Sequence, residues 1–237
     1  MSEKKSSEKK TAEKKDKKTN KNAWLKYSDA QREEVFSVSE GYKKFISDCK
    51  TERECVAEVI RQAEAEGYND LMTLKKVKAG DKVYAQNMDK AVVLFLVGSS
   101  PLEKGMKILG AHIDSPRLDI KQVPVYEDTE MAFLDTHYYG GIKKYQWVTL
   151  PLAIHGIFVK KDGTKVNVCI GEKEEDPVVG ISDLLVHLSA DQMSKTASKV
   201  IEGEDLNVNI GSIPLKDEEK EAVKANAPGR PFLESFV

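Results

Sequence analysis

The sequence predicts an α/β fold in which a helix-flanked mixed sheet extends to about residue 122 and a β-rich module follows it. Three observations support this prediction: apolar residues recur at helical spacing before Gly67, an apolar run extends from Ala91 to Val97, and short strand-like segments dominate after Leu118. A Lys-rich tail, which we assign to residues 1–25, precedes both regions.

The composition is that of a polar globular chain. Its 237 residues are 40% hydrophobic and 32% charged, which excludes collagen, a disulfide-stapled mini-protein and a polytopic membrane protein. The run from Ala91 to Val97 is far shorter than the roughly 20 apolar residues that a membrane helix needs. Three cysteines without CxxC spacing, and the lack of an apolar N-terminal signal, favour a reduced cytoplasmic protein with no membrane partner.

The charge is unevenly distributed along the chain. Residues 1–22 hold nine lysines and four acidic residues, a net charge of +5; the whole chain carries −2, so the remainder carries −7. A segment with so few apolar residues is expected to be disordered, either as a solubilising tail or as a basic arm that touches RNA. The acidic remainder argues against a nucleic-acid partner.

Two amphipathic helices follow the tail. The first is predicted to begin at a cap on Ser28 or Asp29, and the second opens with a capping box from Thr51 to Glu54 and ends at Gly67. The apolar face of the first helix comprises Val35, Val38, Tyr42, Phe45, Ile46 and Cys49. Because Cys49 and Cys55 lie on apolar faces, we interpret them as packing residues rather than redox or metal-binding groups.

Strands replace helices after Gly80. Lys82–Met88 and Ala91–Gly98 flank a short turn near Asp89, which is typical of a hairpin. The uninterrupted apolar sequence of Val92–Val97 predicts a strand that is buried on both faces. A further strand is expected over Met106–Ile113.

The second region reads mainly as short strands, over Trp147–Leu152, Ala153–Val159, Lys165–Ile170 and Leu206–Ile210. Asp162-Gly163 is a strong hairpin turn signal between two of them. Ile181–Ser194 differs because its apolar residues have helical spacing, Glu172–Asp176 reads as a charged loop, and Lys216–Lys224 looks helical.

The sharpest chemical signal is His112-Ile113-Asp114. In a strand, residues two apart point to the same face, so the imidazole and the carboxylate would project together at a strand end. A neutral imidazole is a good zinc ligand, and a neighbouring carboxylate can orient it. Taken alone, the tripeptide is a weak signal that favours a satisfied structural pair over a metal site.

Longer segments resemble a known family. The run Gly110-Ala-His-Ile-Asp-Ser-Pro-Arg-Leu-Asp-Ile-Lys121 closely resembles the signature of the M18 metallo-aminopeptidases, the relatives of aspartyl aminopeptidase. Thr136-His-Tyr-Tyr-Gly-Gly-Ile142 and Gly211-Ser-Ile-Pro-Leu215 look like further family segments. The resemblance extends along most of residues 30–215.

The resemblance implies an α/β catalytic domain with two zinc ions per intact subunit and an inserted β-rich domain that drives dimerisation, with dimers assembling into a dodecamer. Residues 26–122 would then be the first part of the catalytic domain, and residues 123–215 the insertion. By the same resemblance His112 is a metal ligand and Asp114 supports it catalytically. His187, in the segment Ile181–Leu188, would reach a neighbouring subunit's active site and polarise the substrate carbonyl.

The resemblance also implies a function: a zinc-dependent aminopeptidase that removes N-terminal residues from peptide substrates through a metal-activated water. The family's other ligands follow the inserted domain, and no matching motif follows Asp114 here. We therefore expect residues 216–237 to be a truncated or aberrant end and the chain to be inactive alone. The alternative is a non-catalytic oligomerisation or interaction fragment of such an enzyme.

Other motifs favour structural roles. His137 is expected to be a polar packing or loop residue, and His155 a satisfied histidine within an apolar strand. No GxxxxGK[ST] loop and no G-x-S-x-G elbow occurs, so nucleotide binding and serine hydrolysis have no support.

Overall fold

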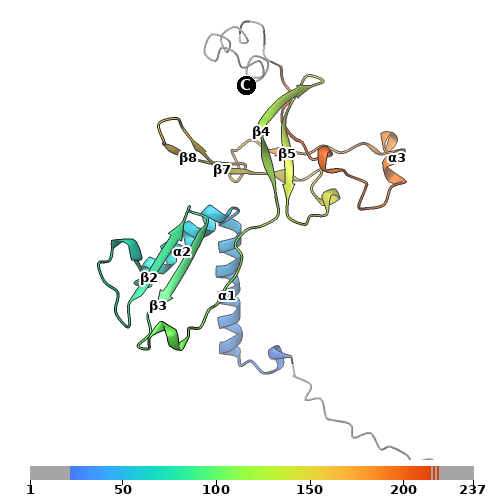
Figure 1. Cartoon of the computed structure of the whole chain (residues 1–237). Helices are drawn as coiled ribbons and strands as arrows, with labels where there is room; N and C mark the ends of the chain where they lie inside the picture. The colour runs from blue at the N-terminus through green and yellow to red at the C-terminus, as the bar shows by residue number, and fades with distance from the viewer. Residues whose placement is uncertain (1–21, 215, 217, 219–237) are drawn as a thin grey trace, which may run out of the picture. The chain divides into compact units, whose positions relative to one another are not determined.

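The computed structural model describes residues 22–214, 216 and 218 and shows a mixed α/β chain, as predicted (Figure 1). Most of the predicted tail, and all but two residues of the helix predicted over Lys216–Lys224, lie outside these residues. At the end of the range assigned to the tail, Ala23–Leu25 form a short 3-10 helix whose Trp24 amide donates to the Asn22 side chain. No helix among the described residues is long and apolar enough to cross a membrane.

The chain forms two units that divide between Ser47 and Asp48, and each is described by itself. The first contains the 3-10 helix and most of helix α1 (Asp29–Asp48). The predicted cap is confirmed, because the Gln31 amide donates to the Ser28 hydroxyl and the Ser28 amide donates to the Gln31 side chain. The Trp24 ring packs at 5.8 Å from the Phe36 ring, which fastens the 3-10 helix to α1.

The second unit opens with helix α2 (Glu52–Ala65), whose predicted capping box is present. The helix ends before Gly67, which has a φ of +84° that favours glycine. A three-stranded sheet follows in the order β1-β2-β3, from β1 (Asn69–Asp70), β2 (Lys82–Asn87) and β3 (Ala91–Leu96). The predicted hairpin is confirmed: β2 and β3 are antiparallel, and Met88 and Asp89 at the turn both have positive φ.

Two predictions about this region are wrong. Val92–Val97 is not buried on both faces: Val93 is 51% exposed and Leu96 is 68% exposed. A run of apolar residues does not by itself show whether other elements cover both faces of the strand. Residues 105–116 form neither helix nor strand, so the strand expected over Met106–Ile113 is absent. An extended segment becomes a strand only when a neighbour pairs with it, and none of the described residues does so here.

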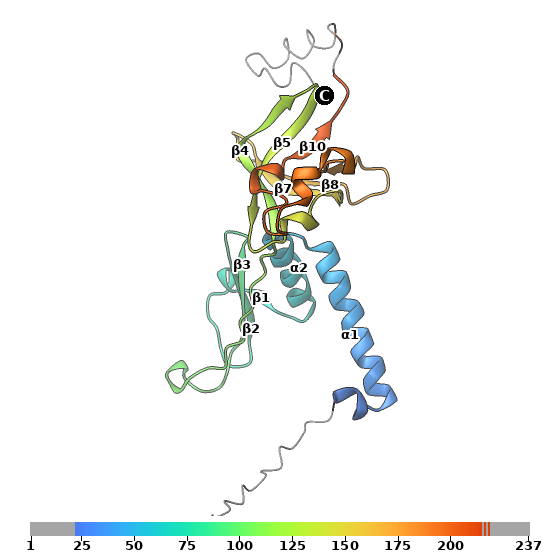
Figure 2. The same ribbon diagram turned by 90° about the vertical axis from the view of Figure 1, so that its right-hand side faces the viewer.

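The β-rich region contains a five-stranded antiparallel sheet in the order β4-β5-β10-β9-β6. Figure 2 labels three of these strands, β4, β5 and β10. Its strands are β4 (Arg117–Asp128), β5 (Met131–Tyr139), β6 (Pro151–Leu152), β9 (Val179–Gly180) and β10 (Val208–Gly211). Its core comprises Leu134, Val148, Val179, Ile181, Ile201, Leu206 and Val208. The predicted strand over Trp147–Leu152 shrinks to Pro151–Leu152, and residues 144–146 form a 3-10 helix.

The long β4–β5 hairpin is absent from our predictions. Its turn uses Thr129 and Glu130, both with positive φ, without the Gly or Asn that usually marks such a turn. The predicted boundary between residues 122 and 123 falls within β4, at an irregularity between Ile120 and Val125. We keep that boundary as a prediction about the whole protein.

A second hairpin, β7 (Ile154–Val159) and β8 (Lys165–Ile170), confirms the turn predicted at Asp162-Gly163 (Figure 1). The charged loop after it is held by Asp176, whose carboxylate accepts the amides of Gly171, Glu172 and Lys173. The segment Ile181–Ser194 is helical only in short pieces, a 3-10 turn over Val186–Leu188 and helix α3 (Ala190–Met193).

Candidate metal-binding site

The candidate site lies where the irregular segment 105–116 enters β4. Its backbone is tied to α2 by the buried Cys55, whose thiol lies 3.7 Å from the carbonyl oxygen of Ile113. Asp114 lies three residues before the first residue of β4, Arg117, which pairs with Tyr139 at the end of β5. The open end of the β4–β5 hairpin therefore lies next to the irregular segment 105–116.

The structure brings His112 and Asp114 together, although not in the strand that we predicted. Nδ1 of His112 lies 3.0 Å from Oδ1 of Asp114 and 3.0 Å from the Asp114 carbonyl oxygen. Both neighbours only accept hydrogen bonds, so the neutral ring carries its proton on Nδ1 and leaves the Nε2 lone pair free. The His112 side chain is 85% exposed, so Nε2 is accessible.

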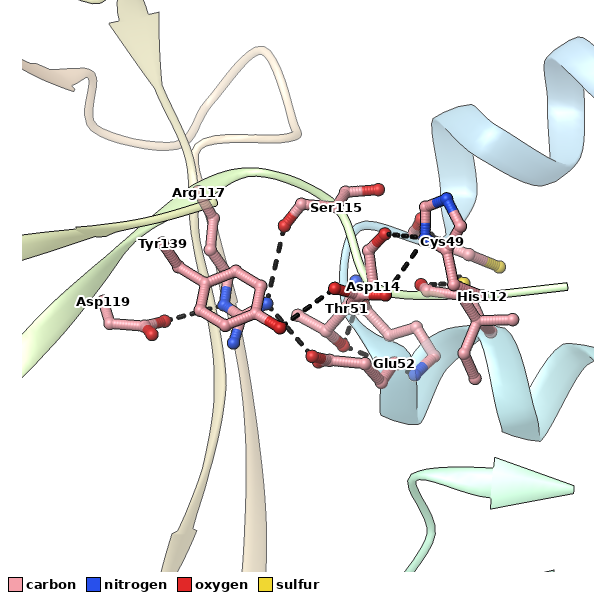
Figure 3. A network of polar contacts seen from close by, with 12 residues as sticks. Cys49, Thr51, Glu52, His112, Asp114, Ser115, Arg117, Asp119 and Tyr139 are labelled. Carbon is pink, nitrogen blue, oxygen red and sulfur yellow. Dashed lines mark hydrogen bonds and ion pairs between the residues drawn. The ribbon is translucent and has the colours of Figure 1, made fainter. Parts of the chain in front are cut away.

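Asp114 is held on its other side by Tyr139 (Figure 3). The Tyr139 hydroxyl donates to Oδ2 of Asp114 at 2.9 Å. The guanidinium of Arg117 lies over the Tyr139 ring, 4.2 Å from its centroid. Arg117 is in turn held by Glu52 at 3.0 Å and by Asp119 at 2.7 Å.

These contacts stabilise the ionised carboxylate. The hydrogen bond from Tyr139, followed by the one from His112, lowers the pKa of Asp114 below its ordinary value. The same bond raises the pKa of Tyr139, because the neighbouring carboxylate disfavours a phenolate. Near neutral pH the pair is therefore a carboxylate and a neutral phenol that donates to it.

A pocket of about 410 Å³ adjoins the pair. Its lining comprises Glu52, Lys90, Ala91, Val92, Ala111, His112, Ile113 and Asp114. Charges of both signs therefore line the pocket, and the exposed imidazole is one of its walls.

His112 and Asp114 fit one zinc ligand and the carboxylate that orients it, because Nε2 is unobstructed and Nδ1 is fixed. The part of the chain that the structure describes contains no group of three or more His, Cys, Asp or Glu side chains that could hold a metal ion. A metal bound at His112 would therefore need further ligands beyond this pair.

His187 is not part of this constellation. It lies in the 3-10 turn Val186–Leu188 with an exposed side chain, and within the described residues it makes no hydrogen bond to His112 or Asp114. The residues that sequence reasoning did not single out are Glu52, Arg117 and Tyr139. Arg117 and Tyr139 lie inside the two segments with family resemblance, but nothing in the sequence indicated that their side chains meet.

The structural interpretation of His155 is confirmed, whereas His137 lies exposed in β5 rather than in a loop. His155 has a side chain only 9% exposed, and its two ring nitrogens lie 2.8 Å from Glu54 and 3.0 Å from Glu172. His137 stacks on the neighbouring ring of Tyr138, with 5.6 Å between centroids.

Comparison with known proteins identifies the family. Residues 45–230 match the sequence profile of the family described as aminopeptidase I zinc metalloprotease (M18). The chain belongs to the M18 family of aminopeptidases. The two segments that carry His112, Asp114 and Tyr139 lie within the matched range.

Individual M18 relatives agree with this assignment. The "Probable M18 family aminopeptidase 1" of Clostridium acetobutylicum is 64% identical over 211 residues, which are 87% of this chain and 45% of the relative. The crystal structure of the M18 aminopeptidase from Thermotoga maritima superposes with a TM-score of 0.78 at 44% identity, covering 87% of this chain and 44% of that one. The S. cerevisiae mApe1 dodecamer, at 19% identity and a TM-score of 0.54, shares the fold.

The chain spans less than half the length of the curated M18 relatives that it matches. The activity and the metal content of those relatives are therefore not assigned to this chain by the match alone.

Proposed function

We propose that this chain is part of a zinc aminopeptidase of the M18 type, in which Nε2 of His112 binds zinc and Asp114 orients the imidazole. The observation that carries the proposal is the 3.0 Å contact between Nδ1 of His112 and Oδ1 of Asp114, which leaves Nε2 accessible beside a pocket. Membership of a family described as zinc metalloproteases supports the metal.

The chain's own residues would prepare the ligand. Asp114 accepts the hydrogen bond from Nδ1–H, which favours the tautomer with a free Nε2 lone pair and makes Nε2 a stronger electron-pair donor to a metal. A zinc ion held by Nε2 of His112 would supply Lewis-acid chemistry, the activation of a water for the hydrolysis of a peptide bond. Our proposal extends, by family resemblance, to two zinc ions per complete subunit and to peptide substrates.

The same resemblance suggests a homo-oligomer, up to a dodecamer, in which His187 of one subunit serves a neighbour's site. The exposed position of His187 is compatible with that role. Because one ligand and one orienting carboxylate cannot hold a metal pair, we propose that the 237-residue chain alone has little or no peptidase activity.

The test compares the chain with a hybrid completed by the corresponding remainder of the Clostridium acetobutylicum relative. We expect the hybrid to bind about two zinc ions per subunit and to release N-terminal residues from peptides, while the chain alone does neither. In the hybrid, His112→Ala should abolish most activity and zinc binding, and Asp114→Ala should weaken both by about 10–100-fold. Full activity and zinc content in the His112→Ala hybrid would refute the proposal.

His137→Ala is the matched control, because His137 is exposed and stacks only on Tyr138 among the described contacts. It removes an imidazole from β5 without touching Asp114. Its activity and zinc content should equal those of the unmodified hybrid.

A second candidate function, a non-catalytic interaction fragment, is favoured by exposed apolar side chains in the segment of residues 178–188, which contains His187. They are Val178, Leu184, Leu185, Val186 and Leu188. Light scattering of the chain alone and mixed with the complete Clostridium acetobutylicum relative separates the two candidates. A complex of defined mass between the two proteins, formed without zinc uptake by this chain, supports the interaction fragment. If light scattering shows only the masses of the two separate proteins, the interaction fragment is not supported.

A further inference from the structure

Asp114 divides its two carboxylate oxygens between different partners. Oδ1 faces Nδ1 of His112 at 3.0 Å, and Oδ2 accepts the Tyr139 hydroxyl at 2.9 Å (Figure 3). A carboxylate bonded through one oxygen only can rotate about its terminal torsion, which is broad and soft. Bonds to both oxygens define the plane of the carboxylate and thus the direction in which Oδ1 points.

The backbone around Asp114 cannot provide this restraint by itself. Residues 105–116 form no helix or strand, and the His112 side chain is 85% exposed, so little packing fixes the ring. The side chain of Asp114 is 38% exposed. The Asp114 carbonyl oxygen, 3.0 Å from Nδ1, helps to hold the ring, but it does not fix the plane of the Asp114 carboxylate. That plane is fixed by a group from another element.

Tyr139 reaches Asp114 from a rigid support. It ends strand β5 opposite Arg117 of β4, so its backbone is fixed by the sheet. The Arg117 guanidinium covers its ring at 4.2 Å from the centroid. Arg117 is itself held by Glu52 from α2 at 3.0 Å and by Asp119 from β4 at 2.7 Å. Two elements thus brace the phenol that points at Asp114.

We propose that Tyr139 is a positioning residue that fixes the Asp114 carboxylate and, through it, the orientation and tautomer of the His112 imidazole. This inference rests on the proposed function, in which Nε2 of His112 is the metal-binding atom. Tyr139 lies in the β-rich region, 25 residues further along the chain than Asp114. Tyr139 would act on the metal ligand only through Asp114, so that its loss would weaken metal binding by His112 without removing the ligand.

The test reads the His112 ring directly and needs neither metal nor activity. In the full chain labelled with ¹⁵N-histidine, two-bond ¹⁵N–¹H correlations at about pH 8.5, where a free imidazole is neutral, report the ratio of the Nδ1–H to the Nε2–H tautomer. Relaxation of the ring reports its order parameter. The His112 signals are assigned by their absence in His112→Gln.

We expect wild type to show the Nδ1–H tautomer. Asp114→Ala should lower the Nδ1–H to Nε2–H ratio by about fivefold, the effect of one lost hydrogen bond of ordinary strength. Tyr139→Phe removes only the hydroxyl and should lower the ratio by about twofold, with a lower ring order parameter. Tyr138→Phe, on the same strand and without a hydrogen bond to Asp114 in the described structure, should match wild type.

The outcomes separate this inference from the proposal beneath it. If Asp114→Ala changes the His112 ring and Tyr139→Phe does not, Tyr139 has no positioning role while the His112–Asp114 pair stands. If Asp114→Ala also leaves the ring unchanged, the orienting role of Asp114 in the proposed function fails as well. An equal response to Tyr138→Phe would show a general effect of altering β5 and would overturn the assignment to Tyr139. Backbone amide spectra confirm that each variant is folded.

Discussion

The three cysteines differ in environment, which makes them useful reporters at the scale of single residues. Cys55 is buried, Cys49 is half-buried and Cys169 is exposed. Burial, followed by the negative charges of neighbouring groups, raises the pKa of Cys49 to about 11. Since the thiolate is the reactive form, Cys49 should be an inert thiol near neutral pH.

Cys49 is therefore expected to react with iodoacetamide at pH 8 about 100-fold more slowly than an unperturbed cysteine, because a pKa of about 11 in place of 9.0 leaves far less thiolate. Mass spectrometry of the labelled native chain gives the rate for each peptide. Cys169, exposed on β8, is the internal comparison and should be alkylated first. Labelling of Cys49 as fast as Cys169 would contradict the prediction.

Two glycines of the β7–β8 hairpin have similar backbone angles but different surroundings. Gly163 has a φ of +86°, and a β-carbon added to it would meet nothing within 4 Å. Gly171 has a φ of +99°, and a β-carbon added there would lie 3.0 Å from Cα of Ala153. Gly163→Ala should lower the free energy of unfolding by about 1–2 kcal/mol through backbone strain alone. Gly171→Ala should cost about 1–3 kcal/mol more, because backbone atoms must move.

Urea denaturation of both glycine variants measures the difference. Gly163→Ala serves as the control, since it introduces the same methyl group at a similar φ. Equal losses of stability would mean that the Ala153 contact imposes no constraint.

At the scale of elements, Glu54 joins a helix to a hairpin. Its Oε2 accepts the amides of Lys50 and Thr51 at the start of α2, and its Oε1 lies 2.8 Å from His155 of β7. Thr51 completes the capping box by accepting the Glu54 amide. One side chain therefore stabilises the helix end and its contact with the β7–β8 hairpin.

Thr51→Ala should lower the free energy of unfolding by about 1 kcal/mol, because it leaves one amide of the first turn unsatisfied. Thermal and urea unfolding measure the loss. Thr51→Ser keeps the capping oxygen and should retain most of the stability. A Thr51→Ser variant as unstable as Thr51→Ala would show that the Thr51 methyl group, and not the cap, matters.

Glu54 should also give stability a dependence on pH. Partial burial alone would raise its pKa, but hydrogen bonds with His155 and with the Lys50 and Thr51 amides outweigh burial and lower the pKa. The ionised carboxylate therefore stabilises the fold above its unfolded pKa of about 4.3, and this contribution disappears as the pH falls through the lower folded pKa.

Glu54→Gln should accordingly lower the free energy of unfolding near pH 6. Between pH 6 and about pH 3 the free energy of unfolding should then fall less steeply in the variant than in wild type, because the variant has no carboxylate to protonate. The measurement is the free energy of urea unfolding across that range. Glu103→Gln, which removes an exposed carboxylate that makes no hydrogen bond among the described residues, corrects for the change in net charge. Parallel curves for wild type and Glu54→Gln would contradict the prediction.

For the molecule as a whole, the predictable features are those encoded within a few residues. The Thr51–Glu54 capping box and the Asp162-Gly163 turn act locally, and both are confirmed. The strand expected over Met106–Ile113 failed because strand formation depends on a partner that the sequence window does not contain. The spacing of His112 and Asp114 predicted that their side chains would lie together. The contacts of Tyr139 with Asp114 and of Glu52 with Arg117 arise only from the tertiary fold and could not be predicted from the sequence.

Several apolar side chains in and after strand β3 are exposed to solvent. Val93, Leu94, Phe95 and Leu96 of β3 are exposed, and so is Leu109 in the neighbouring segment, which is 100% exposed. The chain spans less than half the length of its curated relatives. An edge strand with an exposed apolar face tends to associate with other chains.

We therefore expect the 237-residue chain to associate with itself as its concentration rises, so that its apparent mass in sedimentation equilibrium exceeds 26.5 kDa. Leu96→Lys should shift this association to higher concentration, because burying an unpaired charge against another chain is unfavourable. Ser100→Lys adds the same charge at an exposed polar position beyond the strand and should leave the association as it was. A monomer at every concentration, or equal responses to the two lysines, would show that the exposed face of β3 does not drive the association.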